Sequence, residues 1–172
     1  PAVEGVERAM KFAKQNNVKK VVLTSSVAAI FETGKEKTFY DESDWSNPDS
    51  PVIQNYAKSK TLAEKAAWNY VEKEDNPFEL AVINPALVIG PSLSGDLGVS
   101  NKAIEMVVTG KMPVAIPIQF GFVDVRDVAS AHILAMKNDS SNGERFALAE
   151  KDLWYKDIAK LLRENGFDKA PT

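Results

Sequence analysis

Two short apolar segments, each preceded by a helical pattern, limit the folds open to this sequence. The segments are residues 18–25 and 78–84, and apolar residues recur at helical spacing in the preceding residues 1–15 and 55–73. A continuous apolar run is typical of a strand that is covered on both faces, as in a parallel sheet. Because helix and strand alternate along the chain, we predict an α/β fold with a parallel sheet.

The second half of the chain is less regular. Its predicted elements are, in order, a loop over 91–100, a helix over 101–109, an extended segment over 122–124, a helix over 125–136, a strand over 145–148 and a helix over 152–165. The residues of that last helix predicted to face inward are Trp154, Ile158, Leu161 and Leu162. The pattern predicts a small mixed region here rather than a continuation of the regular alternation.

The composition excludes several kinds of site. The 172 residues include no cysteine and one histidine, so a disulfide framework, a thiolate nucleophile and a histidine-based metal site or catalytic triad lack their ligands. The 21 basic and 24 acidic residues give a net charge of −3, unlike the basic surface of a nucleic-acid-binding protein. No apolar run approaches the roughly 18 residues of a membrane span. We expect no metal, no nucleic-acid partner and no membrane partner, and a cytoplasmic protein.

Three further polar features are interpreted as structural. The single histidine, His132, lies in a predicted helix, and we expect it to support the fold. Asp124 and Arg126 precede or begin the same helix and are expected to fix its start. The acidic segment 41–44 is expected to be a solvated loop and not a metal site.

Tyr56 and Lys60 lie four residues apart at the start of the predicted helix over 55–73, so both side chains project from one face. A lysine ammonium near a phenol stabilises the phenolate and lowers the pKa of the tyrosine from about 10. A tyrosine in that setting can exchange a proton with an alcohol or carbonyl oxygen at neutral pH. An exposed helix also offers this spacing by chance, so the pair is weak evidence alone.

The ends of the two strands give the pair a context. Thr24-Ser25-Ser26 closes the first strand, and ligands in open parallel sheets bind beyond the carboxyl ends of the strands. A hydroxyl there can hydrogen-bond a substrate oxygen, although a Ser/Thr turn that ends a strand is equally common. After the second strand, residues 84–91 (Asn-Pro-Ala-Leu-Val-Ile-Gly-Pro) form either an apolar wall for a flat ring or a simple turn.

Taken together, these segments resemble the extended short-chain dehydrogenase/reductase family. The branch they resemble is the dihydroflavonol-reductase-like one, which includes fungal aldehyde and ketone reductases. The matching segments are, in chain order, 24–26, 41–45, 56–68, 84–91 and 122–132. Tyr-x-x-x-Lys alone is weak, but the ordered set covers nearly the whole chain. The resemblance implies a partial Rossmann-like parallel sheet, with residues 1–90 as the second half of the NAD(P)-binding domain and residues 91–172 as mainly a substrate-binding region.

The resemblance also implies a role for each matching position. Ser26 falls where the family places its catalytic serine, with Ser25 as the alternative, and Tyr56 would be the proton donor in reduction. Lys60 would lower the pKa of Tyr56 and hold the ribose hydroxyls of the nicotinamide nucleotide. The positions implied to contact the cofactor are Tyr56, Lys60, Pro85, Ala86, Leu87, Val88 and Ser100. The implied cofactor is NADP, with NAD as the alternative, and the implied partner is a small-molecule carbonyl substrate.

One expected motif is absent from the 172 residues. The family receives the diphosphate of its cofactor on a glycine-rich turn between the first strand and a helix, and the local Gly95-Asp96-Leu97-Gly98 follows no predicted strand. We therefore expect a fragment that is weak or inactive alone. Its uncovered sheet edge is expected to favour a homo-oligomer or association with the missing N-terminal half.

Three functions remain open at this point. The first is NAD(P)H-dependent reduction of an aldehyde, a ketone or a dihydroflavonol-like carbonyl; the second is a nucleotide-sugar epimerase or dehydratase; the third is a non-catalytic binding module. Retention of the serine, tyrosine and lysine favours an enzyme. The C-terminal region offers only scattered cations for a substrate diphosphate, which favours the reductase. Residues 54–58 lack the aromatic and cysteine pattern of reductases that make lignin aldehydes, which argues against that substrate.

Overall fold

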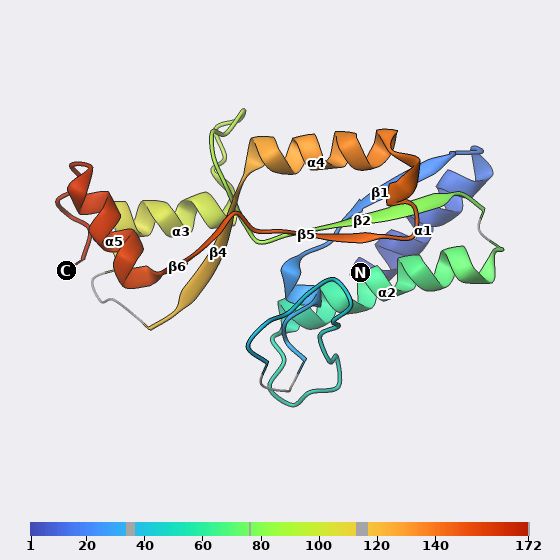
Figure 1. Ribbon diagram of the computed structural model, residues 1–172, viewed down its shortest axis with the longest axis horizontal. Helices are drawn as coiled ribbons and strands as arrows, with labels where there is room; N and C mark the ends of the chain where they lie inside the picture. Colours follow the sequence, from blue (N-terminus) through green and yellow to red (C-terminus); the bar gives the residue numbers. More distant parts are fainter. Residues whose placement is uncertain (34–36, 76, 113–116, 172) are drawn as a thin grey trace. The chain divides into compact units, whose positions relative to one another are not determined.

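The computed structural model, drawn in Figure 1, describes residues 1–33, 37–75, 77–112 and 117–171. They form two compact units, which we call unit 1 and unit 2. Unit 1 contains Pro1–Pro85 and Ala129–Leu148, and unit 2 contains Ala86–Val128 and Ala149–Thr172. The units therefore alternate along the chain, whereas the sequence prediction divides the chain once, after residue 90. No helix among the described residues is long and apolar enough to cross a membrane.

Unit 1 is built on a parallel sheet of three strands. They are β1 (Lys20–Thr24), β2 (Glu79–Pro85) and β5 (Arg145–Leu148), in the order β1-β2-β5. Helix α1 (Ala2–Gln15) precedes β1, and helix α2 (Asn55–Lys73) precedes β2 (Figure 1). The predicted parallel α/β sheet is confirmed, and so are the predicted bounds of the helix over 55–73 and the strand over 145–148.

Alternate residues of β2 pack into two different apolar clusters. Leu80 and Val82 lie in one cluster with residues of α1 and α2. Ala81 and Ile83 lie in another cluster with Ala135 of helix α4 (Val125–Lys137). Because successive side chains of a strand point to opposite faces, the continuous apolar run of β2 is buried on both faces, as predicted. The carboxyl end of the sheet is thereby held between helices.

Unit 2 contains a second three-stranded sheet. Its strands are β3 (Leu87–Ile89), β4 (Gln119–Asp124) and β6 (Lys151–Trp154), with β3 parallel and β6 antiparallel to β4. Helices α3 (Gly98–Val108) and α5 (Tyr155–Glu164) accompany this sheet. The buried residues of its apolar cluster are Val107, Tyr155, Ala159 and Ala170. This mixed sheet corresponds to the irregular second half of the sequence.

The helix predicted over 152–165 is confirmed as α5 except at its start, where residues 152–154 are wrong. Its first residues belong to β6, which pairs with β4 through the register Phe120↔Leu153, and α5 begins only at Tyr155. The predicted inward face is also partly wrong, because Trp154 is 44% exposed and Leu161 is 52% exposed. Pairing with a strand about 30 residues earlier fixes the extended backbone, and this pairing leaves no local signal.

Two smaller differences concern the predicted loop and wall after β2. Helix α3 begins at Gly98, three residues earlier than predicted, so Ser100 lies within a helix and not in a loop. Leu87–Ile89 is a strand, β3, where the sequence suggested an apolar wall or a turn. A strand of three residues that pairs with β4 is too short to show a period of its own.

Candidate active site

The loop after β1 begins at the carboxyl end of the sheet. The backbone amide of Ser25 donates to the Ile83 carbonyl at 2.7 Å, so the loop leaves the sheet beside β2. Ser26 then caps the 3-10 turn η1 (Val27–Ala29): its backbone is extended, and its Oγ accepts a hydrogen bond from the Ala28 amide at 3.2 Å. A serine with this backbone conformation is a typical helix cap, which explains why the turn starts here.

The two serines of this loop differ in what their hydroxyl groups contact. Ser25 Oγ donates to Glu64 Oε2 at 2.5 Å, so its hydrogen is already used within the fold. Ser26 Oγ accepts from a backbone amide, and within the described part of the chain no acceptor takes its hydrogen. Both residues are buried. Of the two, Ser26 is the one whose hydroxyl can donate to another molecule's oxygen.

Helix α2 brings Lys60 to the end of β1. The Lys60 ammonium donates to the Thr24 carbonyl at 3.4 Å, and α2 also packs on η1. Tyr56 lies one turn earlier, about 6 Å along the helix axis. Its side chain is 59% exposed, and among the described residues none hydrogen-bonds to its hydroxyl. Unit 1 therefore places Lys60 at the carboxyl end of β1, where the loop of Ser26 begins, and Tyr56 one turn earlier on the same helix.

The positions expected to contact the cofactor are divided between the units. Pro85 is the buried last residue of β2, where it pairs with Leu148 in unit 1. Ala86, Leu87 and Val88 begin unit 2 and are half-buried, and Ser100 lies in α3 of the same unit. Their roles stay predictions.

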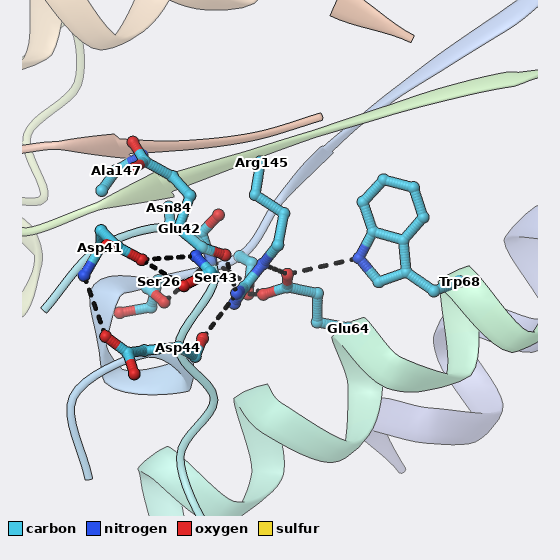
Figure 2. Close-up of polar contacts among 11 residues, drawn as sticks. Ser26, Asp41, Glu42, Ser43, Asp44, Glu64, Trp68, Asn84, Arg145 and Ala147 are labelled. Atoms are coloured by element: carbon cyan, nitrogen blue, oxygen red, sulfur yellow. Dashed lines mark hydrogen bonds and ion pairs between the residues drawn. The ribbon is translucent and has the colours of Figure 1, made fainter. Parts of the chain in front are cut away.

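Unit 1 also contains a buried polar network that the sequence did not suggest. Glu64 of α2 is 1% exposed, and its carboxylate pairs with Arg145 Nε of β5 at 2.6 Å (Figure 2). Asn84 of β2 donates from Nδ2 to Glu64 Oε2 at 2.8 Å and to the Ser26 carbonyl at 3.1 Å. Trp68 Nε1 also donates to Glu64, at 3.4 Å. The network joins α2, β2 and β5, and it reaches the Ser26 loop through the Ser26 carbonyl.

A signal for this network was present in the sequence. Glu64 follows Lys60 by four residues and stands beside Ala63 and Ala67 among the apolar residues at helical spacing in α2. A charge on a buried face requires a partner of opposite charge. The partner, Arg145, lies 81 residues later, and only the parallel pairing of β2 with β5 brings it near.

The acidic segment 41–44 is attached to the sheet through Arg145. Arg145 Nη1 donates to the backbone carbonyls of Glu42 at 2.6 Å and Asp44 at 2.7 Å, and its guanidinium lies 3.8 Å from the ring centroid of Trp45. Glu42 Oε1 accepts the Ala147 amide at 3.0 Å (Figure 2). The segment is a loop with Glu42 and Ser43 exposed, as predicted, but the carbonyls of Glu42 and Asp44 are held by Arg145.

Carboxylates of the same segment are stabilised in their ionised form. The hydroxyl and backbone amide of Ser43 donate to Asp41 and lower its pKa, and the ion pair with Lys37 lowers the pKa of Asp44. Both carboxylates are therefore charged at neutral pH and hold the turn around Ser43.

His132 and Asp124 have the kind of contact expected for structural residues. His132 Nε2 lies 2.7 Å from Thr24 Oγ1, which links α4 to the end of β1. Asp124 accepts the Arg126 amide at 2.8 Å at the start of α4, as predicted, and also pairs with the Arg126 guanidinium. These contacts with Arg126 lower the pKa of Asp124 to about 2.

Comparison with known proteins gives a consistent family. Residues 2–149 match the family described as NAD dependent epimerase/dehydratase. A cinnamoyl-CoA reductase of Medicago truncatula is 41% identical over 170 residues, covering 95% of this chain and 51% of that protein. A putative NADPH-dependent methylglyoxal reductase of Candida albicans is 37% identical over 184 residues, covering 96% of this chain and 53% of that protein.

A solved structure has the same fold. Yeast methylglyoxal/isovaleraldehyde reductase, complexed with NADPH, matches with a TM-score of 0.84 at 32% identity, covering 96% of this chain and 54% of that one. The chain spans about half the length of the curated relatives it matches. These matches confirm the predicted family resemblance and the Rossmann-like α/β fold.

Proposed function

We propose that this chain, which belongs to the NAD-dependent epimerase/dehydratase family, supplies the proton-transfer residues of an NADPH-dependent reductase of aldehydes or ketones. The observation that carries the proposal is the contact of Lys60 with the end of β1, where the loop of Ser26 begins, while the exposed Tyr56 lies one turn earlier on the same helix. Among the described residues no acceptor takes the hydrogen of Ser26 Oγ. The relatives support it, because their names state reduction of a carbonyl compound or a thioester.

Each of the three residues has a separate role at the oxygen of the substrate carbonyl. Tyr56 gives its phenolic proton to that oxygen, and Ser26 donates a hydrogen bond to it. Lys60 places a positive charge beside the phenolate that Tyr56 becomes, and solvent returns the proton afterwards. When bound, the reduced nicotinamide supplies the hydride that the carbonyl carbon receives. The chain's own contribution is a set of fixed donors for the negative charge that develops on oxygen.

The donor set also fits a nicotinamide nucleotide. An ammonium and a phenol one helical turn apart suit the two ribose hydroxyls, and Tyr56 and Lys60 would hold them. Pro85, the last residue of β2, would supply apolar surface for the ring. The contacts that the family resemblance implies for Ala86, Leu87, Val88 and Ser100, which belong to unit 2, stay predictions. We assign NADP as the cofactor because a relative is named as NADPH-dependent and a matching solved structure is complexed with NADPH.

The test is an assay of the full-length protein that contains this chain. NADPH oxidation is followed with methylglyoxal, aliphatic ketones, a dihydroflavonol and cinnamoyl-CoA; the last is included because a relative is named for it, and the sequence argument against lignin substrates stays a prediction. Tyr56→Phe is expected to lower kcat by about 10²–10⁴-fold. Tyr70→Phe, on the same helix and stacked on Phe78, is the matched control and is expected to keep full activity.

Two outcomes would contradict the proposal. Undiminished turnover in Tyr56→Phe would remove the assigned proton donor. Interconversion of a nucleotide sugar with no net consumption of NADPH would make the protein an epimerase, in which the nicotinamide is recycled within each turnover.

A further inference from the structure

Glu64 is a buried carboxylate surrounded by hydrogen-bond donors. The side chain is 1% exposed, and the four groups that donate to it are Ser25 Oγ, Asn84 Nδ2, Trp68 Nε1 and Arg145 Nε. Removing a carboxylate from water costs free energy, and hydrogen bonds from these four donors offset that cost. Moving any donor away would therefore destabilise the buried carboxylate. The carboxylate therefore fixes the relative positions of the elements from which the donors come.

Those elements include both sides of the proposed site. Glu64 lies four residues after Lys60 and eight after Tyr56, so the three side chains follow one stripe of α2. Its partner Ser25 is the residue before Ser26 in the loop after β1. The carboxylate thus ties the helix that carries the phenol and the ammonium to the loop that carries the serine.

Asn84 provides a second tie to the same loop. Its Nδ2 group donates both to Glu64 and to the Ser26 carbonyl (Figure 2). The Ser26 carbonyl also accepts the Ala29 amide at 2.9 Å, which closes the turn η1. With its carbonyl held by two donors, the peptide after Ser26 has little freedom, and the direction of the Ser26 side chain follows from it.

Arg145 supplies the counter-charge of Glu64 in the interior. The Arg145 side chain is 8% exposed, and its Nε pairs with Glu64, so this ion pair joins α2 to β5. The same guanidinium holds the backbone of segment 42–44. Arg145 therefore reaches the Ser26 loop through Glu64, and it hydrogen-bonds to none of the three proposed catalytic residues.

We propose that Glu64, paired with Arg145, is the positioning residue that sets Ser26 against Tyr56. This inference rests on the proposed function, because Ser26 and Tyr56 act on the substrate only if the protein is a carbonyl reductase. Glu64 itself does not touch the substrate. Its effect on turnover is exerted through the hydroxyl of Ser26.

A double-mutant cycle in the full-length protein tests this path. Glu64→Gln is expected to lower kcat by about 10–100-fold while the KM for the carbonyl substrate changes less than about threefold. In a Ser26→Ala background the same substitution is expected to change kcat by no more than about twofold, because the group it positions has gone. Additive effects of the two substitutions would overturn the proposal. Glu72→Gln, an exposed charge on the same helix, is the control and is expected to leave kcat unchanged.

Hydrogen exchange gives a readout that needs no activity. The Ala29 and Ile30 amides, which close η1, are expected to exchange about tenfold faster in Glu64→Gln than in wild type or Glu72→Gln. If Glu64→Gln does not fold, Ser25→Ala carries the same test, since it removes one donor and no charge. Unchanged exchange at these amides would refute the positioning role. A wild-type protein that reduces no carbonyl would refute the proposed function, and the exchange measurement would then decide the role of Glu64 alone.

Discussion

Removal of Arg145 alone is expected to destabilise the fold more than removal of the whole ion pair. Arg145→Met deletes the bond to Glu64, the bonds to two backbone carbonyls and the stacking on Trp45. It also leaves the Glu64 carboxylate buried without its counter-charge, since the side chains are 8% and 0% exposed. Breaking a buried pair from one side costs about 3–5 kcal/mol, and we expect Arg145→Met to lie in this range.

The double variant isolates the cost of the stranded charge. In Glu64→Gln/Arg145→Met neither member of the buried ion pair carries a charge. We expect the double variant to be at least about 1 kcal/mol more stable than Arg145→Met, because the buried carboxylate no longer lacks a partner. Lys160→Met is the control: Lys160 also pairs with a glutamate, but at 3.9 Å and 75% exposed, so its loss is expected to cost at most about 1 kcal/mol.

The assay is urea unfolding of the full-length protein, followed by far-UV circular dichroism. Comparison of the midpoints is valid where the slope of free energy against urea is unchanged. The reasoning is refuted if Arg145→Met loses no more stability than Lys160→Met. It is also refuted if the double variant is as unstable as the sum of the single variants, because the buried charge would then contribute nothing of its own.

The remaining predictions concern unit 2. Contacts with Arg126 lower the pKa of Asp124 from 3.8 to about 2, so this carboxylate stabilises the fold above pH 3.8 and loses that effect as the pH falls towards 2. Asp124→Asn is therefore expected to be less stable than wild type at neutral pH and equally stable near pH 2 in urea titrations. Gly110 and Gly166 both have positive φ, and a methyl group costs each about 1–2 kcal/mol. Gly110→Ala is expected to lower the thermal midpoint further, because its methyl group meets the Lys169 carbonyl at 2.8 Å while the methyl group at Gly166 meets nothing within 4 Å.

The sheet of unit 1 was predictable because its signals are local. The apolar run of β2 sends Leu80 and Ile83 to opposite clusters, so a continuous run correctly indicates a strand covered on both faces. The bounds of α2 were also predictable, since its apolar spacing ends shortly before Pro77, which cannot continue a helix.

Unit 2 was harder to predict because its strands depend on distant partners. Leu153 is extended only because Phe120 pairs with it, and its own neighbours continue the helical pattern of α5. A sequence window around residues 152–165 contains no trace of β4. A prediction from the local pattern therefore begins the helix three residues too early, within the strand β6.

The candidate site was predicted in part. Spacing and strand ends pointed to Tyr56, Lys60 and the Ser25-Ser26 pair, and the family resemblance favoured Ser26. In the structure, Glu64 takes the hydrogen of Ser25, whereas no acceptor among the described residues takes that of Ser26. The physical reason for the distinction is a carboxylate that lies 39 residues after Ser25, and only the fold brings the two together.

The Glu64–Arg145 pair is better explained by geometry than by stability. A well-packed apolar pair of similar volume is often as stable as a buried ion pair, so stability alone gives no reason for a charge here. An apolar pair, however, cannot hold the hydroxyl of Ser25 and the amide of Asn84 at fixed distances, as this carboxylate does. Because Tyr56 and Lys60 stand on the same helix, a shift of α2 that displaced them would also break these bonds. The charged network therefore makes the position of the proton donor and the position of the serine loop depend on each other.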